Sequence, residues 1–282
     1  MTAVWGVFYR ANAQLLFGGF IVLSLLVVAA LAPQLAAHDP MDQDLLNQML
    51  PPLWLERGDP EFLLGTDELG RDILARLIWG ARPAVFVMFS GAALSGIVGM
   101  LLGLFAGYFG GWVDIVISRV VEIFMSFPPM LLAIVLAAVM GPGLRTVVIA
   151  VAMIGWVRFC RVVRGEVLVM RELEFVTSAR IVGVSHLRLI FHELLPNLAP
   201  LLFVLFGLEM GRAIVVEAVL SFIGFSSSDI PTWGGIIAGG RPYIYQAWWI
   251  MTFPIGVIVM TVLGLNAFGD GLRTTTDPVL QR

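Results

Sequence analysis

The sequence predicts an all-α polytopic membrane protein with six transmembrane helices. Hydrophobic residues make up 59% of the 282 residues and charged residues only 13%, whereas about a quarter of an ordinary soluble domain is charged. A soluble fold does not bury so much apolar surface, so lipid is the predicted solvent of most of the chain. The six predicted spans are residues 15–35, 84–108, 113–140, 147–159, 198–223 and 247–268.

The first apolar run has a competing interpretation as a secretory signal peptide. Residues 35–37, Leu-Ala-Ala, offer a candidate cleavage region. The run is longer than the ~7–15 apolar residues of a signal-peptide core. We therefore predict that it is retained in the protein as the first span.

An acidic segment, residues 36–83, separates the first two spans, and Pro40, Pro51, Pro52 and Pro60 break it into irregular pieces. It has nine acidic and four basic side chains, and a packed domain is not expected there. Thr66 is a candidate helix cap, and apolar residues recur after it at the spacing of a helix that lies along the membrane surface. We therefore divide the chain into an N-terminal segment, 1–83, and a five-helix transmembrane domain, 84–282.

Small residues recur at every fourth position along the second span and just beyond it: Gly91, Ser95, Gly99, Gly103, Gly107 and Gly111. Positions four apart lie on one side of a helix, and such ridges of small residues let two membrane helices approach closely. The pattern predicts a packing face for another helix.

The distribution of arginine predicts the orientation of the spans. Six arginines lie between residues 158 and 188, and basic residues concentrate in cytoplasmic loops. With six spans, this places both termini and the loop 158–197 in the cytoplasm. The segments 36–83 and 224–246 are then extracytoplasmic.

The loop 158–197 contains a polar elbow between two apolar segments. Gly183 is predicted to end a short amphipathic helix, and a second helical stretch follows it. Pro196 lies where the fifth long helix begins, because proline in a first turn removes only a donor that has no partner there. The alternative is an ordinary solvated loop. Four apolar residues recur at helical spacing in the first helix: Phe175, Val176, Ala179 and Val182.

This elbow resembles the cytoplasmic EAA loop of ABC importer permeases, whose pattern is Glu-Ala-Ala, three residues, Gly, nine residues, Ile, one residue and Leu-Pro. Residues 177–179, Thr-Ser-Ala, stand at the Glu-Ala-Ala position, and Glu193 stands at the Ile. Residues 174–183 fit the variant of the dipeptide, oligopeptide and nickel branch. In that family the loop docks on a separate ATPase subunit, so the resemblance implies an ATPase-coupling role for Glu174, Phe175, Val176, Thr177, Ser178, Ala179, Arg180, Gly183, Leu195 and Pro196.

A second stretch resembles the same branch, residues 64–82, with the sequence LGTDELGRDILARLIWGAR. The elements Gly-Thr-Asp-x-x-Gly-Arg-Asp and Gly-Ala-Arg form its signature on the extracytoplasmic side. The signature residues are Gly65, Thr66, Asp67, Gly70, Arg71, Asp72, Gly80 and Arg82.

The resemblance runs from Leu64 to Pro278 and is to the dipeptide permease subunit that pairs with a second, different permease. It implies a type I ABC importer permease fold, a bacterial or archaeal cytoplasmic membrane, and half of a translocation pathway for dipeptides or oligopeptides. The implied partners are a second homologous permease, one or two ABC ATPases that bind ATP and Mg, an extracytoplasmic solute-binding protein and the lipid bilayer. No cofactor is expected in this chain.

Five ionisable residues lie within the predicted spans, where charge is costly. Arg119 and Glu122 are three residues apart, as are Glu209 and Arg212, so each pair can meet on one helix face. Glu217 has no evident partner on its own helix. These charges either lock helices together or line a route for a charged or zwitterionic solute.

Composition and motifs exclude several classes of function. The chain has no lysine and therefore no Walker A phosphate loop. No catalytic motif or metal-ligand cluster is present, and no basic tract indicates nucleic acid. Two rivals remain: a proton-coupled secondary transporter that uses Glu122, Glu209 or Glu217, and a non-transporting membrane scaffold. The solute stays open among dipeptides, oligopeptides, nickel chelates, glutathione and antimicrobial peptides.

Overall fold

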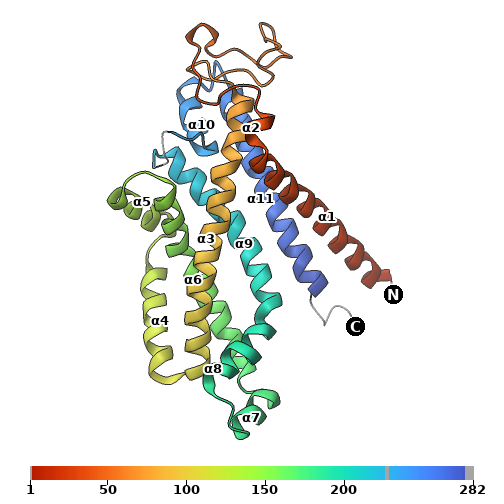
Figure 1. Ribbon diagram of the computed structural model, residues 1–282, viewed down its shortest axis with the longest axis vertical. Helices are drawn as coiled ribbons and strands as arrows, with labels where there is room; N and C mark the ends of the chain where they lie inside the picture. Colours follow the sequence, from red (N-terminus) through yellow and green to blue (C-terminus); the bar gives the residue numbers. More distant parts are fainter. Residues whose placement is uncertain (1, 226–228, 277–282) are drawn as a thin grey trace.

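The computed structural model describes the backbone of residues 2–225 and 229–276, and the side chains of residues 13–225 and 229–272. In this part of the chain every element is helical apart from one isolated bridge between Thr66 and Asp72. Figure 1 shows an elongated bundle of long helices with loops and short helices at its two ends. The Asp-Pro at 277–278, where the family resemblance ends, lies outside the described residues.

Five helical stretches are long and apolar enough to cross a membrane: Ala13–Ala30, Ile73–Phe109, Leu144–Met170, His186–Phe222 and Trp249–Leu272. A sixth crossing is made if the bent pair Gly111–Ser126 and Pro129–Met140 counts as one span. The predicted all-α, polytopic architecture is therefore confirmed. The first helix, α1 (Thr2–Ala30), begins earlier than expected, and the short α2 (Ala32–Leu35) follows it.

The third predicted span is not one straight helix. It consists of α4 (Gly111–Ser126) and α5 (Pro129–Met140), which meet at an angle of 88°. Pro128 and Pro129 explain the break, since proline cannot donate a backbone hydrogen bond and disfavours helical geometry in the preceding residue. Phe127 accordingly has an extended backbone, with φ −95° and ψ 138°.

The expected helix along the membrane surface is instead the first part of α3 (Ile73–Phe109), which continues through Pro83 as the second span. The prediction that Thr66 caps this helix is wrong. Asp72 is the cap, and its carboxylate accepts a hydrogen bond from Leu74 N at 3.0 Å. Residues 65–71 form tight turns, which leave no room for a helix to start earlier.

The ridge of small residues packs against α6 (Leu144–Met170), as the sequence predicts. A Cβ on Gly103 would lie 2.7 Å from Cys160 O and 2.9 Å from Val163 Cβ, so only glycine fits there. The close approach continues at Gly91, which faces Val151, and at Gly107, which faces Val167. Gly111 departs from the pattern: it begins α4 with φ +51° and has no such neighbour within 4 Å.

The helix α6 is longer than the predicted fourth span, which was placed at residues 147–159. Arg158, Arg161 and Arg164 therefore lie on a helix and not in the cytoplasmic loop. The helix continues past these charges because two of them have partners on neighbouring helices: Arg158 pairs with Glu209, and Arg164 pairs with Asp114.

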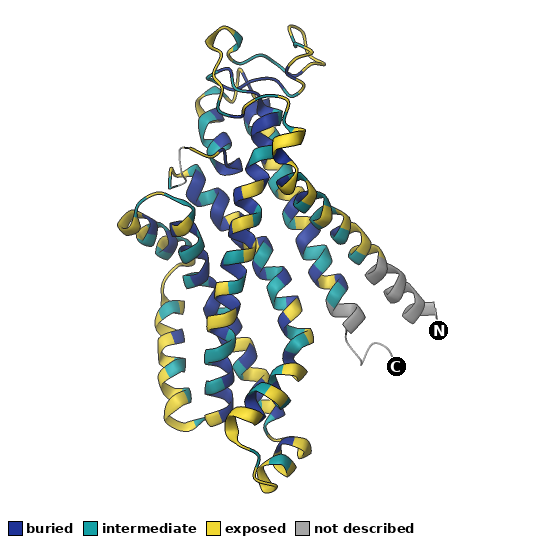
Figure 2. Cartoon of the chain, in the orientation of Figure 1, coloured by how far each residue is buried: buried dark blue, intermediate teal, exposed yellow. Residues whose placement is uncertain are grey.

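The remaining long helices are α9 (Leu195–Phe222) and α11 (Trp249–Thr276). Figure 1 shows α1 lying beside α11, away from α4 and α5. The two meet closely, since a Cβ on Gly264 would lie 2.5 Å from Ile21 Cγ2. Much of the outer face of α1 is exposed in Figure 2, including Leu16, Phe20 and Leu23, as expected for a surface that contacts lipid.

Short elements occupy the two ends of the bundle. One end holds residues 36–72 with the short helix η1 (Leu45–Asn47), together with α10 (Trp233–Gly240) and η3 (Arg241–Tyr243). The opposite end holds α7 (Glu174–Ile181), α8 (His186–Arg188) and the π-helix η2 (Leu189–Leu194). In Figure 1 the N-terminal end of α1 and the C-terminal end of α11 both point toward the end of the bundle that holds α7.

Candidate functional site

The elbow between α6 and α9 contains the predicted helix–turn–helix. Leu173, with an extended backbone, precedes α7, and Gly183 ends it with φ +84°. Gly183 N donates to Arg180 O and Val184 N to Ala179 O, both at 3.0 Å. These bonds satisfy the last carbonyls of the helix and need the left-handed conformation that glycine adopts without strain.

Three side-chain contacts hold the elbow in place. Val176 is fully buried and packs in a cluster with Leu189 and Ile190 of η2. Tyr108 of α3 places its hydroxyl 2.7 Å from His186 Nδ1, and the guanidinium of Arg180 lies over the Tyr108 ring at 4.9 Å. The end of α7 and the start of α8 are therefore both connected to the last turn of α3.

The outer side of the elbow is apolar and uncovered. Ile181 and Val182 are 81% and 82% exposed, and Phe175 and Leu187 are also exposed. The predicted apolar face is therefore buried only in part, by Val176 and the half-buried Ala179. Figure 2 shows this exposed surface at the α7 end. Of the other candidate coupling residues, Leu195 is half-buried, whereas the exposed ones are Glu174, Thr177, Ser178, Arg180, Gly183 and Pro196.

The extracytoplasmic signature segment is a set of tight turns on the start of α3. Thr66 Oγ1 accepts from Leu50 N at 2.9 Å and donates to Asn47 O. Its carbonyl accepts from Trp249 Nε1 at 3.2 Å. Gly65 and Gly70 have φ +79° and +75°, which glycine allows. The segment is thus held by the chain before it and by α11.

Asp67 is the centre of this segment and is almost fully buried. Its Oδ1 accepts from Leu69 N at 2.9 Å and Arg71 N at 3.0 Å. Its Oδ2 accepts from Arg71 Nε at 2.7 Å and lies 3.2 Å from Arg76 NH1. Sequence reasoning missed Arg76, whose burial depends on the folded turn. The other partners of the segment are Glu68 Oε1, 3.0 Å from Arg71, and His38 Nδ1, 2.9 Å from Asp72.

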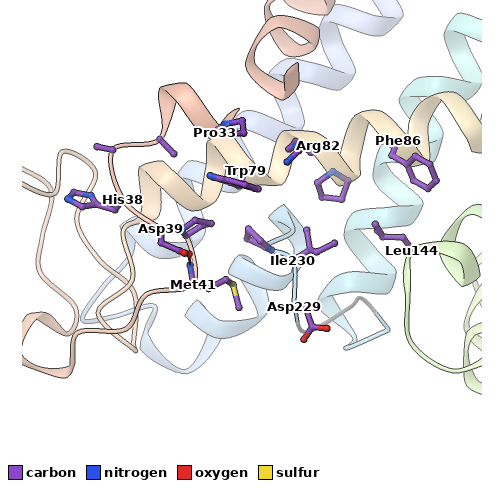
Figure 3. A pocket seen from close by; sticks show the side chains of 15 residues that line it. Pro33, His38, Asp39, Met41, Trp79, Arg82, Phe86, Leu144, Asp229 and Ile230 are labelled. Carbon is purple, nitrogen blue, oxygen red and sulfur yellow. Dashed lines mark hydrogen bonds between the residues drawn. The ribbon is translucent and has the colours of Figure 1, made fainter. Parts of the chain in front are cut away.

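Gly80 and Arg82 have different surroundings. The indole of Trp233 occupies the space beside Gly80, where a Cβ would lie 2.7 Å from Trp233 Cδ1, and Trp233 Nε1 donates to Leu77 O at 3.0 Å. Arg82 lies 5.2 Å from the centre of the Trp79 ring. Both Arg82 and Trp79 line an outer cavity of about 830 Å³, which Figure 3 shows between α3, residues 33–41 and residues 229–231.

The charges within the spans fall into separate groups. Arg119 NH1 and Glu122 Oε2 meet at 2.7 Å on α4, where both side chains are largely exposed. Glu209 lies 3.9 Å from Arg212 on its own helix, as the spacing predicted. Its nearer partner is Arg158 of α6, at 2.6 Å, which sequence reasoning missed because the two are 51 positions apart.

Glu217 has a partner on its own helix, contrary to the sequence-based prediction. The Ser221 hydroxyl, one turn later on α9, donates to Glu217 Oε1 at 2.7 Å. The prediction considered only charged partners, and a serine four residues away is an uncharged one. Among the described residues, no group of three or more His, Cys, Asp or Glu side chains is arranged to hold a metal ion.

Comparison with known families agrees with this architecture. Residues 99–280 match the family of binding-protein-dependent transport system inner membrane components, and residues 4–52 match the N-terminal transmembrane domain of oligopeptide transport permease C. The chain belongs to this permease family.

Two curated relatives of the permease match it along nearly its whole length. The di/tripeptide transport system permease protein DppC of Pseudomonas aeruginosa is 41% identical over 94% of this chain and 88% of its own. The dipeptide transport system permease protein DppC of Haemophilus influenzae is 37% identical over 98% of this chain and 94% of its own.

A solved structure has the same fold as the permease. The inward-facing MetNI methionine ABC transporter includes a chain that superposes with a TM-score of 0.60, at 18% identity, over 73% of this chain and 98% of that one. The type I ABC importer permease fold is therefore confirmed.

Family membership separates the three functional interpretations of the sequence. The permease is a membrane component of a bacterial transport system and not an enzyme, and it works with a solute-binding protein and an ATPase. The proton-coupled carrier and the non-transporting scaffold are thereby set aside. Several apolar helices make it a multi-pass membrane protein, as the composition predicted.

Proposed function

We propose that this permease forms one half of a pathway that carries dipeptides or short oligopeptides inward across the cytoplasmic membrane. A second homologous permease supplies the other half, as in the subunit pairing that the sequence resemblance implies. The observation that carries this proposal is the 37–41% identity, over nearly the full chain, to permeases of di- and tripeptide transport systems.

The proposed orientation places the α7 end in the cytoplasm. This end of the bundle carries the elbow, with Arg171 directly after α6, Arg180 on α7 and Arg188 on α8. The positive-inside rule favours such a segment on the cytoplasmic side. Both termini are then cytoplasmic, and the acidic segment 36–72 faces the solute-binding protein.

The elbow is the proposed contact with the ATPase. It presents uncovered apolar side chains, Ile181 and Val182 among them, at an end where lipid does not cover them in the proposed orientation. ATP and Mg would bind to the ATPase subunits, one or two of which complete the importer. Closure of the ATPases would push the elbow, and Tyr108 and Val176 would transmit the movement to α3 and η2, so that the helices rock between inward- and outward-facing states.

Purification and transport together test this proposal. The permease is purified in mild detergent from its native membranes, its companions are identified by mass spectrometry, and the complex is reconstituted with loaded binding protein for dipeptide uptake. We expect a second permease, at least one ATPase, and uptake that depends on ATP. Recovery of the permease alone, under conditions that preserve other membrane complexes, would contradict it.

A matched pair of variants tests the elbow in the same preparation. Ile181→Asp places a charge on the exposed apolar face and should remove the ATPase from the purified complex. Tyr245→Asp changes a side chain that is 98% exposed beyond the opposite end of the bundle and should leave the ATPase bound. Equal ATPase recovery with both variants would reject the elbow as the docking site.

A further inference from the structure

Two arginines share one glutamate at the crossing of α6 and α9. Arg158 NH1 donates to Glu209 Oε2 at 2.6 Å, and Arg212 NH1 lies 3.9 Å from the same oxygen. The local charge is therefore +1. Gly155 makes room for the carboxylate, since a Cβ there would lie 2.8 Å from Ser95 Cβ and would also collide with Glu209 Oε1.

In this cluster the glutamate side chain is buried, whereas the two arginine side chains are partly exposed. The Glu209 side chain is 5% exposed, whereas those of Arg158 and Arg212 are 40% and 50% exposed. A guanidinium has five N–H donors. Within the described part of the chain, Arg158 uses one of them on Glu209, and Arg212 donates no hydrogen bond. Most donors of both arginines therefore have no hydrogen-bond partner within the described part of the chain.

Both arginines lie deep within their spans. Arg158 is about 21 Å along the helix from Leu144 and about 18 Å from Met170, at 1.5 Å per residue. Arg212 is about 26 Å from Leu195 and about 15 Å from Phe222 by the same measure. Charge at such depth usually faces a water-filled path or another protein group and not lipid. This face of α6 and α9 is therefore a candidate lining of the translocation pathway.

Arg158 is one of the residues that line a cavity beside α6. The cavity has a volume of about 270 Å³ and lies between α6 and the break that joins α4 to α5. Its wall is mainly apolar, with Phe124 and Leu132, and Arg158 and Arg161 supply its charges. A carboxylate attached to an apolar group has the matching chemistry, because arginine binds carboxylates through charge-assisted hydrogen bonds.

We propose that Arg158 and Arg212 form an intramembrane carboxylate subsite that receives the C-terminal carboxylate of a peptide in transit. Glu209 is the positioning residue, which holds both guanidinium groups at the pathway and partly balances their charge. This inference deepens the proposed function and rests on it. The subsite explains why three charged residues lie at mid-span, with the Glu209 side chain buried and the two arginine side chains partly exposed.

The test uses the reconstituted complex with saturating loaded binding protein and measures initial uptake of Ala-Ala and Ala-Glu. Arg212 is the variant site, because Arg212→Gln leaves the pair of Arg158 and buried Glu209 intact. We expect Arg212→Gln to reduce uptake of both peptides by about tenfold, as loss of a charge-assisted hydrogen bond predicts. Arg212→Lys keeps the charge and should retain more uptake than Arg212→Gln. Arg145→Gln, an exposed site near the other end of α6, should leave uptake unchanged.

Four results would overturn the subsite. Wild-type uptake of both peptides by Arg212→Gln removes the role of Arg212 altogether. A loss confined to Ala-Glu assigns the arginine to acidic side chains and not to the C-terminus. Loss of the second permease from the purified Arg212→Gln complex shows that the arginine pairs with an acid of that subunit. Absence of peptide uptake by the wild-type complex rejects the proposed function itself. This result is seen without any variant, so it is distinguishable from failure of the subsite alone.

Discussion

The hydroxyl of Tyr108 lies 2.7 Å from Nδ1 of His186, which joins the last turn of α3 to the start of α8 across 78 positions of the chain. The Tyr108 ring also contacts the Arg180 guanidinium, so one side chain touches both helices of the elbow. The same α3 packs along α6 through its ridge of glycines. The elbow is therefore connected to α3 and, through the packing of α3, to α6, and this is the route by which we propose that its movement is transmitted.

Tyr108→Phe is expected to weaken the coupling of ATP hydrolysis to transport. The variant removes the hydrogen bond to His186, worth about 1 kcal/mol, and keeps the ring that contacts Arg180. We expect lower peptide uptake per ATP hydrolysed in reconstituted complexes. Tyr243→Phe, in η3 at the opposite end, is the control and should keep the wild-type ratio. An unchanged ratio with Tyr108→Phe would exclude this hydrogen bond from coupling.

Substitution of Gly183 is expected to separate folding of the membrane part from function of the elbow. Proline cannot adopt the φ of +84° observed there, and its missing N–H would break the bond to Arg180 O. Gly183→Pro should therefore insert in the membrane but abolish uptake. Asparagine tolerates the left-handed region, and no atom lies within 4 Å of a Cβ at this position, so Gly183→Asn should keep most uptake. Wild-type uptake by Gly183→Pro would reject the assigned role of the elbow.

The sequence predicted the helical fold, five of the small residues in the packing ridge, and the helix–turn–helix of the elbow. It did not predict the length of α6, because Arg158 and Arg164 read as the end of a span. Their partners, Glu209 and Asp114, lie on other helices, and only the fold brings them together. The break after α4 had a visible signal in Pro128 and Pro129, which the length of the surrounding apolar run concealed.

In the signature segment, too, the sequence identified the residues but not their partners in the fold. Asp67 and Arg71 were identified from their motif, but the motif does not reveal that Asp67 is buried between Arg71 and Arg76. Thr66 was expected to cap a helix, whereas the turns around Gly65 and Gly70 delay the helix to Ile73. Patterns along the chain identify helices, but the partners of a buried charge depend on contacts between distant residues.

The glycine ridge of α3 predicts unequal effects of two similar substitutions. Gly103→Ala places a Cβ 2.7 Å from Cys160 O, which is backbone and cannot move freely, so we expect a loss of stability of about 1–3 kcal/mol. Gly165→Ala, on the facing helix α6, has open space and should be neutral or stabilising by up to about 1 kcal/mol. Thermal unfolding of the two purified variants in detergent gives the comparison. Equal midpoints would show that α3 and α6 do not pack as described.

Substitution of Asp67 is expected to cause the largest loss of stability among these sites. Asp67→Asn removes the charge that Arg71 and the buried Arg76 share, and leaving a buried charge unpaired typically costs about 3–5 kcal/mol. The turns at residues 65–71 also hold the start of α3 against Trp249 of α11, so the outer segment should become sensitive to protease before the bundle unfolds. Asp42→Asn, an exposed carboxylate in the same segment, is the control and should keep wild-type resistance. Equal protease resistance of the two variants would show that the buried ion pairs do not hold this segment in place.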